Sequence, residues 1–169
     1  TYSPNSVANY TIMLMLMACR NIPFIMHHAE EQNFTLKGKM GKELSTSTVG
    51  VIGTGKIGET VIRHLAGFGC RILAYDPYPK KSLDGIAEYA DLDRIYAESD
   101  IITLHAPGAA GNHHMLDSSA FGKMKDGVII VNAARGSLID TAALISAIES
   151  GKVGFAALDT FENETGLYY

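Results

Sequence analysis

Short apolar runs alternate with longer, more polar segments over most of the chain. Each run has the length and composition of a strand that is buried on both faces of a parallel sheet. The runs lie at 49–52, 71–75, 101–105, 128–132 and 154–158, with a weaker one at 86–89. The intervening segments predict helices at 56–67, 92–98, 118–124 and 141–150. This alternation predicts an α/β fold with one doubly wound parallel sheet, covered by helices on both faces.

A different pattern precedes the first strand. Ser3 and Pro4 are typical of a helix start, as the N-cap and a first-turn residue. We expect this helix to end near Asn21, because Pro23 disfavours helical backbone in the residue before it. Residues 27–47 are polar and contain two glycines, which favours an irregular connector on the surface.

The apolar block at 11–19 is too short to span a bilayer and lacks the basic flank of a signal peptide. We interpret it as part of a helix that is buried or faces a second subunit. The whole chain, 1–169, then forms one domain, with an inter-domain or subunit helix at 1–22 and a strand–helix core at 48–160. The chain begins within three residues of a helix cap and ends soon after the last strand. We therefore expect a domain that is truncated at both ends.

Composition narrows the class of protein. The 169 residues are 47% hydrophobic and 19% charged, which is a globular composition. The net charge of 14 − 18 = −4 gives no electrostatic reason to expect nucleic acid or an anionic membrane as a partner. Cys19 and Cys70 lie in apolar runs, which favours core thiols in a reducing cytoplasm over a disulfide.

The first strand runs directly into a glycine motif, Gly53-Thr54-Gly55-Lys56-Ile57-Gly58, which opens the next helix. Gly53 suits a tight turn, Gly55 lets the backbone approach a pyrophosphate, and Gly58 lets the helix pack against the strand. The N–H groups and the positive dipole end of that helix attract phosphates. The motif therefore predicts a dinucleotide site; the alternative is an ordinary glycine-rich turn.

An acidic residue stands where such a site needs one. Asp76 ends the second strand, 76 − 58 = 18 residues after the last glycine. An acid at this distance meets the adenosine ribose hydroxyls and disfavours a 2′-phosphate, which predicts NAD rather than NADP. Lys80 and Lys81 are close by in sequence and weaken that preference slightly.

Ligands of an open parallel sheet bind outside the carboxyl ends of the strands. Arg135 follows the strand at 128–132 and offers a planar fork for a substrate carboxylate, or a structural ion pair. Asp159 ends the last strand and could accept a hydrogen bond from a cofactor amide, or cap a turn. His105 ends another strand, where a structural histidine is favoured. None of the six histidines has a ligand spacing, so we expect no metal site.

Several blocks together resemble the D-2-hydroxyacid dehydrogenases. They are the glycine motif, Tyr75-Asp76-Pro77, Val131-Asn132-Ala133-Ala134-Arg135-Gly136 and Ala157-Leu158-Asp159-Thr160-Phe161-Glu162-Asn163-Glu164. The opening segment at 2–11 resembles the D-lactate dehydrogenase branch. Glu164 is followed by Thr165 and not by the proline of the phosphoglycerate and formate branches, which is similar to D-lactate and D-2-hydroxyisocaproate dehydrogenases.

The resemblance implies a Rossmann NAD-binding domain and a role for each matching residue. Arg135 would hold the substrate carboxylate, and Glu164 would hydrogen-bond the catalytic histidine. Asp76 would bind the ribose and Asp159 the nicotinamide amide. The remaining cofactor contacts would be Gly53, Thr54, Gly55, Lys56, Ile57, Gly58, Ala106, Pro107, Asn112, Ala133 and Ala134.

The family's catalytic histidine lies in a later block that this chain does not reach, and most of the substrate domain is absent. The resemblance thus implies half of a homodimeric enzyme that transfers hydride between NADH and a 2-keto acid such as pyruvate, with this chain alone inactive. It does not say which 2-hydroxy acid is used. Glu162 and Glu164, taken singly, are typical of solvated surface acids.

Two other readings stay open. A non-enzymatic NAD sensor or interaction module is favoured by the missing histidine, whereas the presence of Arg135 and Glu164 favours an enzyme. A different nucleotide-binding Rossmann domain, such as a methyltransferase, would be compatible with Asp76 but is not suggested by the block around Arg135.

Overall fold

The computed structural model describes residues 3–164. Its six strands form one sheet in the order β3-β2-β1-β4-β5-β6, and every neighbouring pair is parallel. The strands are β1 Thr48–Ile52, β2 Arg71–Tyr75, β3 Glu88–Tyr89, β4 Ile101–Leu104, β5 Val128–Asn132 and β6 Val153–Leu158. The strand order reverses between β1 and β4, which is where ligands of doubly wound sheets bind.

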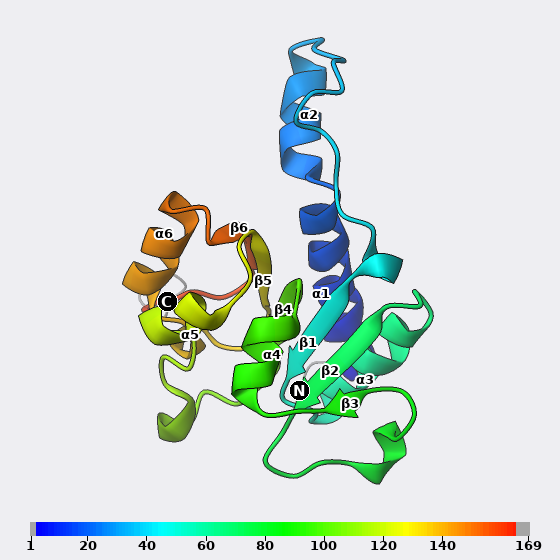
Figure 1. Cartoon of the computed structure of the whole chain (residues 1–169), viewed down its shortest axis with the longest axis vertical. Coiled ribbons are helices and arrows are strands. Elements are labelled where there is room, and N and C mark those ends of the chain that lie inside the picture. The colour runs from blue at the N-terminus through cyan, green and yellow to red at the C-terminus, as the bar shows by residue number, and fades with distance from the viewer. Residues whose placement is uncertain (1–2, 165–169) are drawn as a thin grey trace.

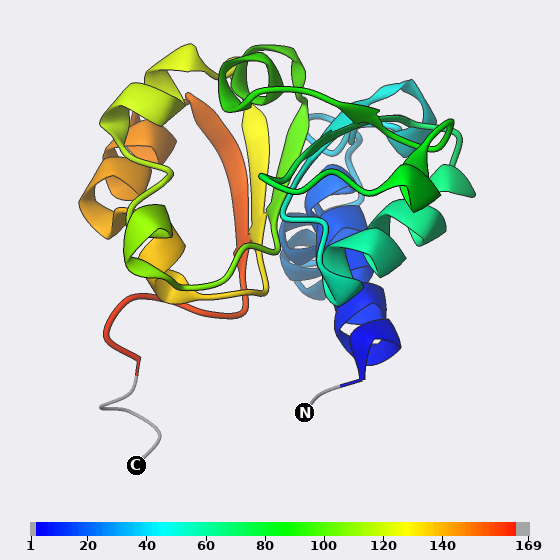
Figure 2. The ribbon, with the colours of Figure 1, turned by 90° about the horizontal axis from the view of Figure 1, so that it is seen from below.

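Helices cover both faces of this sheet (Figures 1 and 2). They are α1 Pro4–Cys19, α2 Ile22–Glu30, α3 Lys56–Ala66, α4 Leu92–Glu98, α5 Ser118–Lys123 and α6 Thr141–Glu149. Short 3-10 turns lie at Leu44–Thr46, Lys81–Leu83, Ala110–Asn112 and Gly136–Leu138. The predicted doubly wound α/β fold is confirmed, and the weak run at 86–89 supplies a real but two-residue strand.

The strands separate two apolar cores because successive side chains point to opposite faces. Val49 and Val51 of β1 join the core beneath α1 and α3. Ile102 and Leu104 of β4 join the core beneath α4, α5 and α6. In β5 every residue is buried, as expected for a strand covered on both faces.

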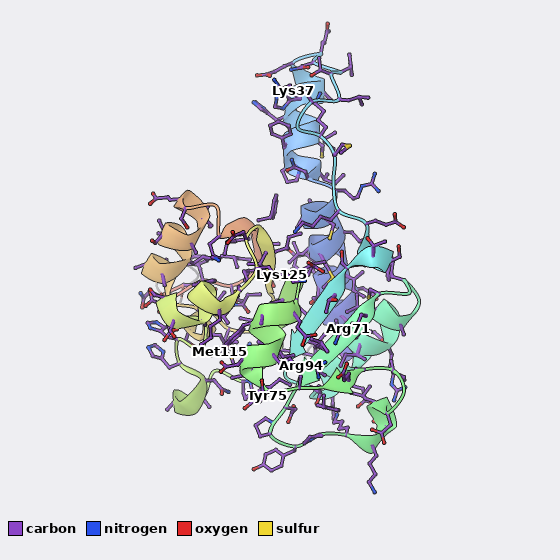
Figure 3. All side chains as sticks on the ribbon, viewed as in Figure 1. Lys37, Arg71, Tyr75, Arg94, Met115 and Lys125 are labelled. Atoms are coloured by element: carbon purple, nitrogen blue, oxygen red, sulfur yellow. The ribbon has the colours of Figure 1, made fainter. Side chains whose placement is uncertain are left out.

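Ion pairs stabilise the edge of the sheet that is formed by β3. Arg71 and Arg94 lie near each other on β2 and α4 (Figure 3). Both contact the carboxylates of Glu88 and Glu98, with N–O distances of 2.5–3.2 Å. The four side chains connect β2, β3 and α4, so this short edge strand is held by side chains as well as by its ladder.

The region before β1 departs from the prediction. Residues 27–30 belong to α2 and not to an irregular connector, and α1 ends at Cys19. Asn21 breaks the helix with a left-handed φ of 52°, and Pro23 then occupies the first turn of α2, where no N–H is needed. Ser3 takes the N-cap position, but its side chain makes no capping bond. α2 projects away from the sheet and buries none of its residues (Figure 1).

Within residues 3–164, no single helix has the length and apolarity to cross a membrane. Only α1 and α2 taken together pass such a test, and they are bent by 61° relative to each other.

Candidate functional site

The three glycines of the motif have different structural roles in the loop between β1 and α3. Gly53 has φ 95°, and a Cβ there would lie 2.6 Å from the His105 carbonyl carbon. A Cβ on Gly58 would lie 1.9 Å from the Gly53 oxygen. A Cβ on Gly55, by contrast, would meet nothing within 4 Å. Two glycines are therefore required by the fold, whereas the third borders open space at the N-terminus of α3, as a pyrophosphate cradle requires.

Asp76 is fixed beside this loop. Its Oδ2 accepts a 2.7 Å hydrogen bond from the Thr54 amide, and its Oδ1 accepts one of 2.9 Å from the Tyr78 amide. Burial opposes the charged carboxylate, but these amides outweigh it and hold the pKa of Asp76 below its usual value. Each oxygen keeps a further lone pair for a ribose hydroxyl.

A second layer holds Thr54 in place. Thr54 is fully buried, and the Tyr89 hydroxyl donates to its Oγ1 over 3.0 Å. The same hydroxyl accepts from the Lys80 amide, also over 3.0 Å. The glycine loop, Asp76 and the start of the loop after β2 therefore form one hydrogen-bonded unit, which fits the adenosine side of NAD.

The turn after β5 is fixed by a buried asparagine. Asn132 Oδ1 accepts from the Ala134 amide over 3.0 Å, and its Nδ2 donates to the Arg135 carbonyl over 2.9 Å. The Arg135 stem lies over Gly108, where a Cβ would be 3.0 Å from Arg135 Cγ. Arg135 Nη1 donates only to the Ala134 carbonyl, and no acid among residues 3–164 forms an ion pair with Arg135. Its guanidinium retains donors for an anionic ligand.

The loop after β4 borders the same edge. Asn112 Nδ2 donates to the Pro107 carbonyl over 2.9 Å, which brings these two predicted cofactor contacts together. His105 Nε2 lies 3.0 Å from Thr103 Oγ1, and burial lowers the pKa of His105 to about 4. The imidazole is therefore neutral at pH 7, as suits a structural histidine beside Gly53.

Asp159 follows β6, and its amide donates to the Asn132 carbonyl over 2.9 Å. Its carboxylate faces Tyr10 of α1 and, chiefly by its negative charge, raises the pKa of that phenol. Asp159 is exposed, so the carboxylate is accessible to a cofactor amide.

The segment after β6 carries the two glutamates. Glu164 Oε2 accepts from the Phe161 amide over 3.1 Å. Glu162 is instead a structural anchor with a 22% exposed side chain: its Oε2 accepts from the amide and hydroxyl of Thr141 over 2.9 and 2.5 Å. His114 Nε2 lies 2.6 Å from Glu162 Oε1. The Thr141 hydroxyl and then His114 lower the pKa of Glu162 to about 2.

The absence of a side chain at Gly136 allows the segment after β6 to pack closely against it, since a Cβ there would lie 2.1 Å from the Phe161 carbonyl. The expectation of a solvated surface acid is therefore wrong for Glu162. No local pattern reveals the contact, because His114 and Glu162 are 48 positions apart in sequence. The anchor matters because it fixes the segment that carries Glu164.

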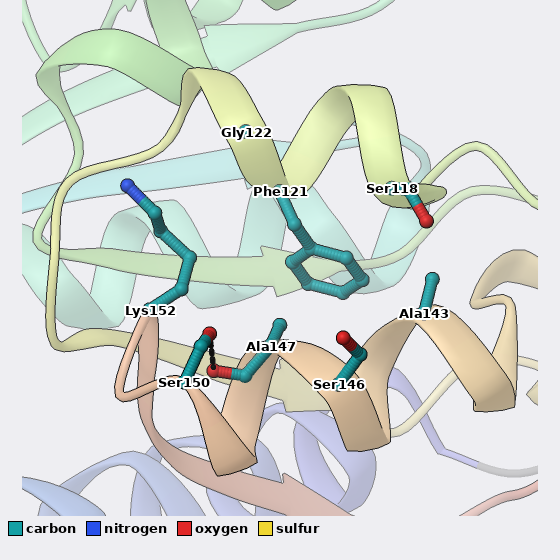
Figure 4. Close-up of a pocket in the computed structure, with 8 residues that line it drawn as sticks. All are labelled: Ser118, Phe121, Gly122, Ala143, Ser146, Ala147, Ser150 and Lys152. Carbon is teal, nitrogen blue, oxygen red and sulfur yellow. Dashed lines mark hydrogen bonds between the residues drawn. The ribbon is translucent and has the colours of Figure 1, made fainter.

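A hollow of about 190 Å³ lies away from this chemistry, between α5 and α6 (Figure 4). Phe121 and Ala147 form part of its wall. The Ser150 hydroxyl donates to the Ala147 carbonyl over 3.1 Å, and Lys152 Nζ donates to the Met124 carbonyl over 3.1 Å. Because these polar groups are bonded to the helices themselves, we interpret the hollow as a packing groove. Within the described part of the chain, no group of three His, Cys, Asp or Glu residues could hold a metal ion.

The sheet order, the glycine loop and Asp76 define a Rossmann dinucleotide-binding domain. Comparison with known proteins specifies the family. The profile of the D-isomer specific 2-hydroxyacid dehydrogenase NAD-binding domain matches residues 12–166. The chain belongs to this family, and the predicted resemblance and the NAD cofactor are confirmed.

Individual proteins that are similar to the chain support the same family assignment. The chain is 48% identical over 169 residues to an aromatic 2-oxoacid reductase of Clostridium sporogenes, covering 99% of the chain and 51% of the relative. It is 46% identical over 168 residues to a D-lactate dehydrogenase of Lactiplantibacillus plantarum, with the same coverage. A crystal structure of D-lactate dehydrogenase from Aquifex aeolicus with NAD and lactic acid superposes with a TM-score of 0.95 at 38% identity, covering 99% and 51% of the two chains. The chain spans about half the length of the curated relatives it matches.

Proposed function

We propose that this chain is the NADH-binding half of a D-2-hydroxyacid dehydrogenase of the D-lactate dehydrogenase branch, which reduces a 2-keto acid such as pyruvate. The observation that carries the proposal is the shared ligand edge of the sheet. One end of this edge has open space next to Gly55 and the hydrogen-bonded carboxylate of Asp76. The other end has Arg135, whose guanidinium retains N–H donors for a ligand.

The bound nicotinamide would supply the hydride. Gly53, Gly55 and the N-terminus of α3 would hold the pyrophosphate, Asp76 the ribose, and Asp159 the carboxamide. Lys56, Ile57, Ala106, Pro107, Asn112, Ala133 and Ala134 would complete the cofactor side.

Arg135 would align the substrate carboxylate through two parallel hydrogen bonds, which fixes the carbonyl to be reduced. Glu164 would act on a histidine outside this chain, favouring its protonated form for proton delivery to the carbonyl oxygen. The contacts of Glu162 with His114 and Thr141 support this assignment, because they hold the segment in which Glu164 lies.

We also infer a homodimer in the cytoplasm. The α2 arm and the segment after it expose large apolar side chains, namely Phe24, Met26, Phe34, Leu36 and Met40. A monomer would present them to water as one extended apolar surface. A second subunit would cover them, and Met13 of α1, which is 43% exposed, would extend the same interface. The free thiols of Cys19 and Cys70 suit a reducing compartment.

Calorimetric titration of the chain with NADH and NADPH tests the cofactor site. We expect NADH to bind and NADPH to bind more weakly; equal or tighter binding of NADPH would overturn the NAD assignment. The chain alone should show essentially no pyruvate-dependent oxidation of NADH. A full-length protein that contains this chain should show it, and inactivity of that protein with pyruvate and with aromatic 2-keto acids would overturn the proposed reaction.

A further inference from the structure

One glutamate on α3 pairs with a lysine of the loop after β2 and with an arginine one turn further along its own helix. Glu59 stands in the first turn of α3, and its side chain is 23% exposed. Lys80 Nζ lies 2.9 Å from its Oε2. Arg63 donates to its Oε1 through Nη2 over 2.8 Å and through Nε over 3.2 Å. The Ser82 hydroxyl adds a bond of 3.1 Å to the same oxygen.

Lys80 is tied to the cofactor loop through its backbone. Its amide donates to the Tyr89 hydroxyl, which in turn donates to Thr54 between the first two motif glycines. The ammonium of Lys80 also contributes to the lowered pKa of Asp76, so its charge reaches the carboxylate that would meet the ribose. A cation in this neighbourhood is what accommodates a 2′-phosphate in NADP-binding domains.

The charges of the four side chains in this group cancel. Lys80 and Arg63 supply two positive charges, and Glu59 and Asp76 supply two negative ones. The Lys80 ammonium and then the Arg63 guanidinium hold the pKa of Glu59 at about 2, so the glutamate is ionised at any physiological pH. A 2′-phosphate would have to draw these cations away from Glu59 before it could use them.

We propose that Glu59 is a specificity determinant: by pairing with Lys80 and Arg63, it denies these cations to a 2′-phosphate and so reinforces the preference for NAD over NADP. Asp76 repels the phosphate directly, whereas Glu59 acts through the cations. The inference rests on the proposed cofactor site and assigns a second residue to its selectivity.

The test is the substitution Glu59→Gln in this chain, with dissociation constants for NADH and NADPH measured by calorimetry. Glutamine keeps the size of the side chain and a hydrogen bond for Ser82 but frees the two cations. We expect NADPH to bind about tenfold more tightly than to the parent, with the gain shrinking at high salt. NADH should change less than about threefold, because it carries no 2′-phosphate.

Glu149→Gln is the matched control, because it removes the same charge at an exposed position at the end of α6. It should leave both constants within about twofold of the parent. Combining Glu59→Gln with both Lys80→Met and Arg63→Met should return NADPH affinity to about the parent value. Lys80→Met alone should change NADPH binding less than about threefold, since Glu59 already occupies that ammonium.

The outcomes separate the two hypotheses. Failure of the parent to bind NADH would refute the cofactor site itself. Normal NADH binding with an unchanged NADPH-to-NADH ratio in Glu59→Gln would overturn the role of Glu59. If Glu59→Gln does not fold, Lys80→Met decides alone: a loss of NADPH affinity as large as tenfold would show that Glu59 does not withhold the lysine.

Discussion

The two ends of the ligand edge are organised differently. Near β1 and β2, Asp76, Thr54 and Tyr89 bond to one another across separate segments of the chain. Near β5 and β6, the hydrogen bonds of the Arg135 and Glu164 side chains within residues 3–164 go to main-chain groups one and three residues away. The first end is already arranged for a ligand, whereas at the second end no other side chain among residues 3–164 forms a hydrogen bond with these two groups.

The difference between the two ends agrees with the finding that this chain covers only about half of each relative. Contacts of the adenosine end lie within residues 53–89, so they form as this domain folds. The match covers about half the length of these relatives, and we propose that the remainder of such a protein completes the substrate end. Substitutions at the first end should therefore alter cofactor binding, and those at the second should alter turnover with little effect on cofactor affinity.

The largest expected effect is at Gly55. Gly55→Val should lower NADH affinity by at least about a hundredfold, because its side chain would fill the space that the pyrophosphate needs. The fold should survive, since φ is −59° and a Cβ meets nothing within 4 Å. Calorimetry and thermal unfolding of the chain measure the two effects.

Gly58→Val is the contrasting variant, because its Cβ would lie 1.9 Å from the Gly53 oxygen, and it should not fold. If Gly55→Val binds NADH as tightly as the parent does, the loop does not hold the pyrophosphate.

The substitution Arg135→Lys tests the end of the ligand edge near β5, where we expect an effect on turnover and not on NADH binding. In a full-length protein that contains this chain, kcat/KM for pyruvate-like acids should fall by an amount equivalent to about 2–4 kcal/mol. Lysine keeps the charge but loses the fork that aligns the carboxylate. NADH affinity should hardly change. A variant in which NADH binding falls and kcat is preserved would place Arg135 on the cofactor and not on the substrate.

Local sequence patterns were sufficient to predict most of the fold. Apolar runs located all six strands, and the glycine motif with Asp76 located the hydrogen-bonded loop that we propose for the adenosine end, because both depend on residues that are close in sequence. The end of the first helix was predicted to within two residues, since α1 ends at Cys19. The prediction was wrong for residues 27–30, because Pro23 lies in the first turn of a second helix, α2, which continues to Glu30.

The ion pairs of the site could not be predicted in this way. Glu162 and His114 are 48 positions apart, and Glu59 and Lys80 are 21 positions apart. In sequence each of these side chains has the surroundings of a solvated surface residue. Only the packing of the segment after β6 against the loop that carries His114, and of the loop after β2 against α3, brings the partners together.

A smaller effect is expected at Glu162. Glu162→Gln should lower the free energy of unfolding of the chain by about 1 kcal/mol at pH 7, because it weakens the bonds to Thr141 and His114. The pKa of Glu162 is lowered from 4.5 to about 2 in the folded chain. Its contribution is therefore complete above pH 4.5 and is lost as the pH falls towards 2.

Urea unfolding of parent and variant at several pH values gives this difference directly. Glu149→Gln serves again as the control for charge alone, and its unfolding free energy should stay within about 0.5 kcal/mol of the parent. A difference at Glu162 that is the same at pH 3 as at pH 7 would mean that the charge of Glu162 contributes nothing.

The effect that is smallest at pH 7 concerns His105, which borders both the glycine loop and β4. A Cβ on Gly58 would lie 3.4 Å from His105 Cβ, so the imidazole is close to the positive N-terminus of α3, where a second positive charge is unfavourable. Burial lowers its pKa from 6.5 to about 4. Between these values the unfolded chain binds a proton that the folded chain does not, so the free energy of unfolding should decrease as the pH falls through this window.

Proton NMR of the His105 ring tests the assignment, with a short peptide of residues 103–107 as the reference for an unburied histidine. The ring signals of the chain should stay at their neutral positions from pH 8 to about pH 5.5, while those of the peptide titrate near the ordinary pKa of about 6.5. A midpoint near that of the peptide would show that the imidazole is accessible to water. His105 would then be a possible proton donor at the cofactor edge, and the functional contrast between the two ends of the edge would no longer hold.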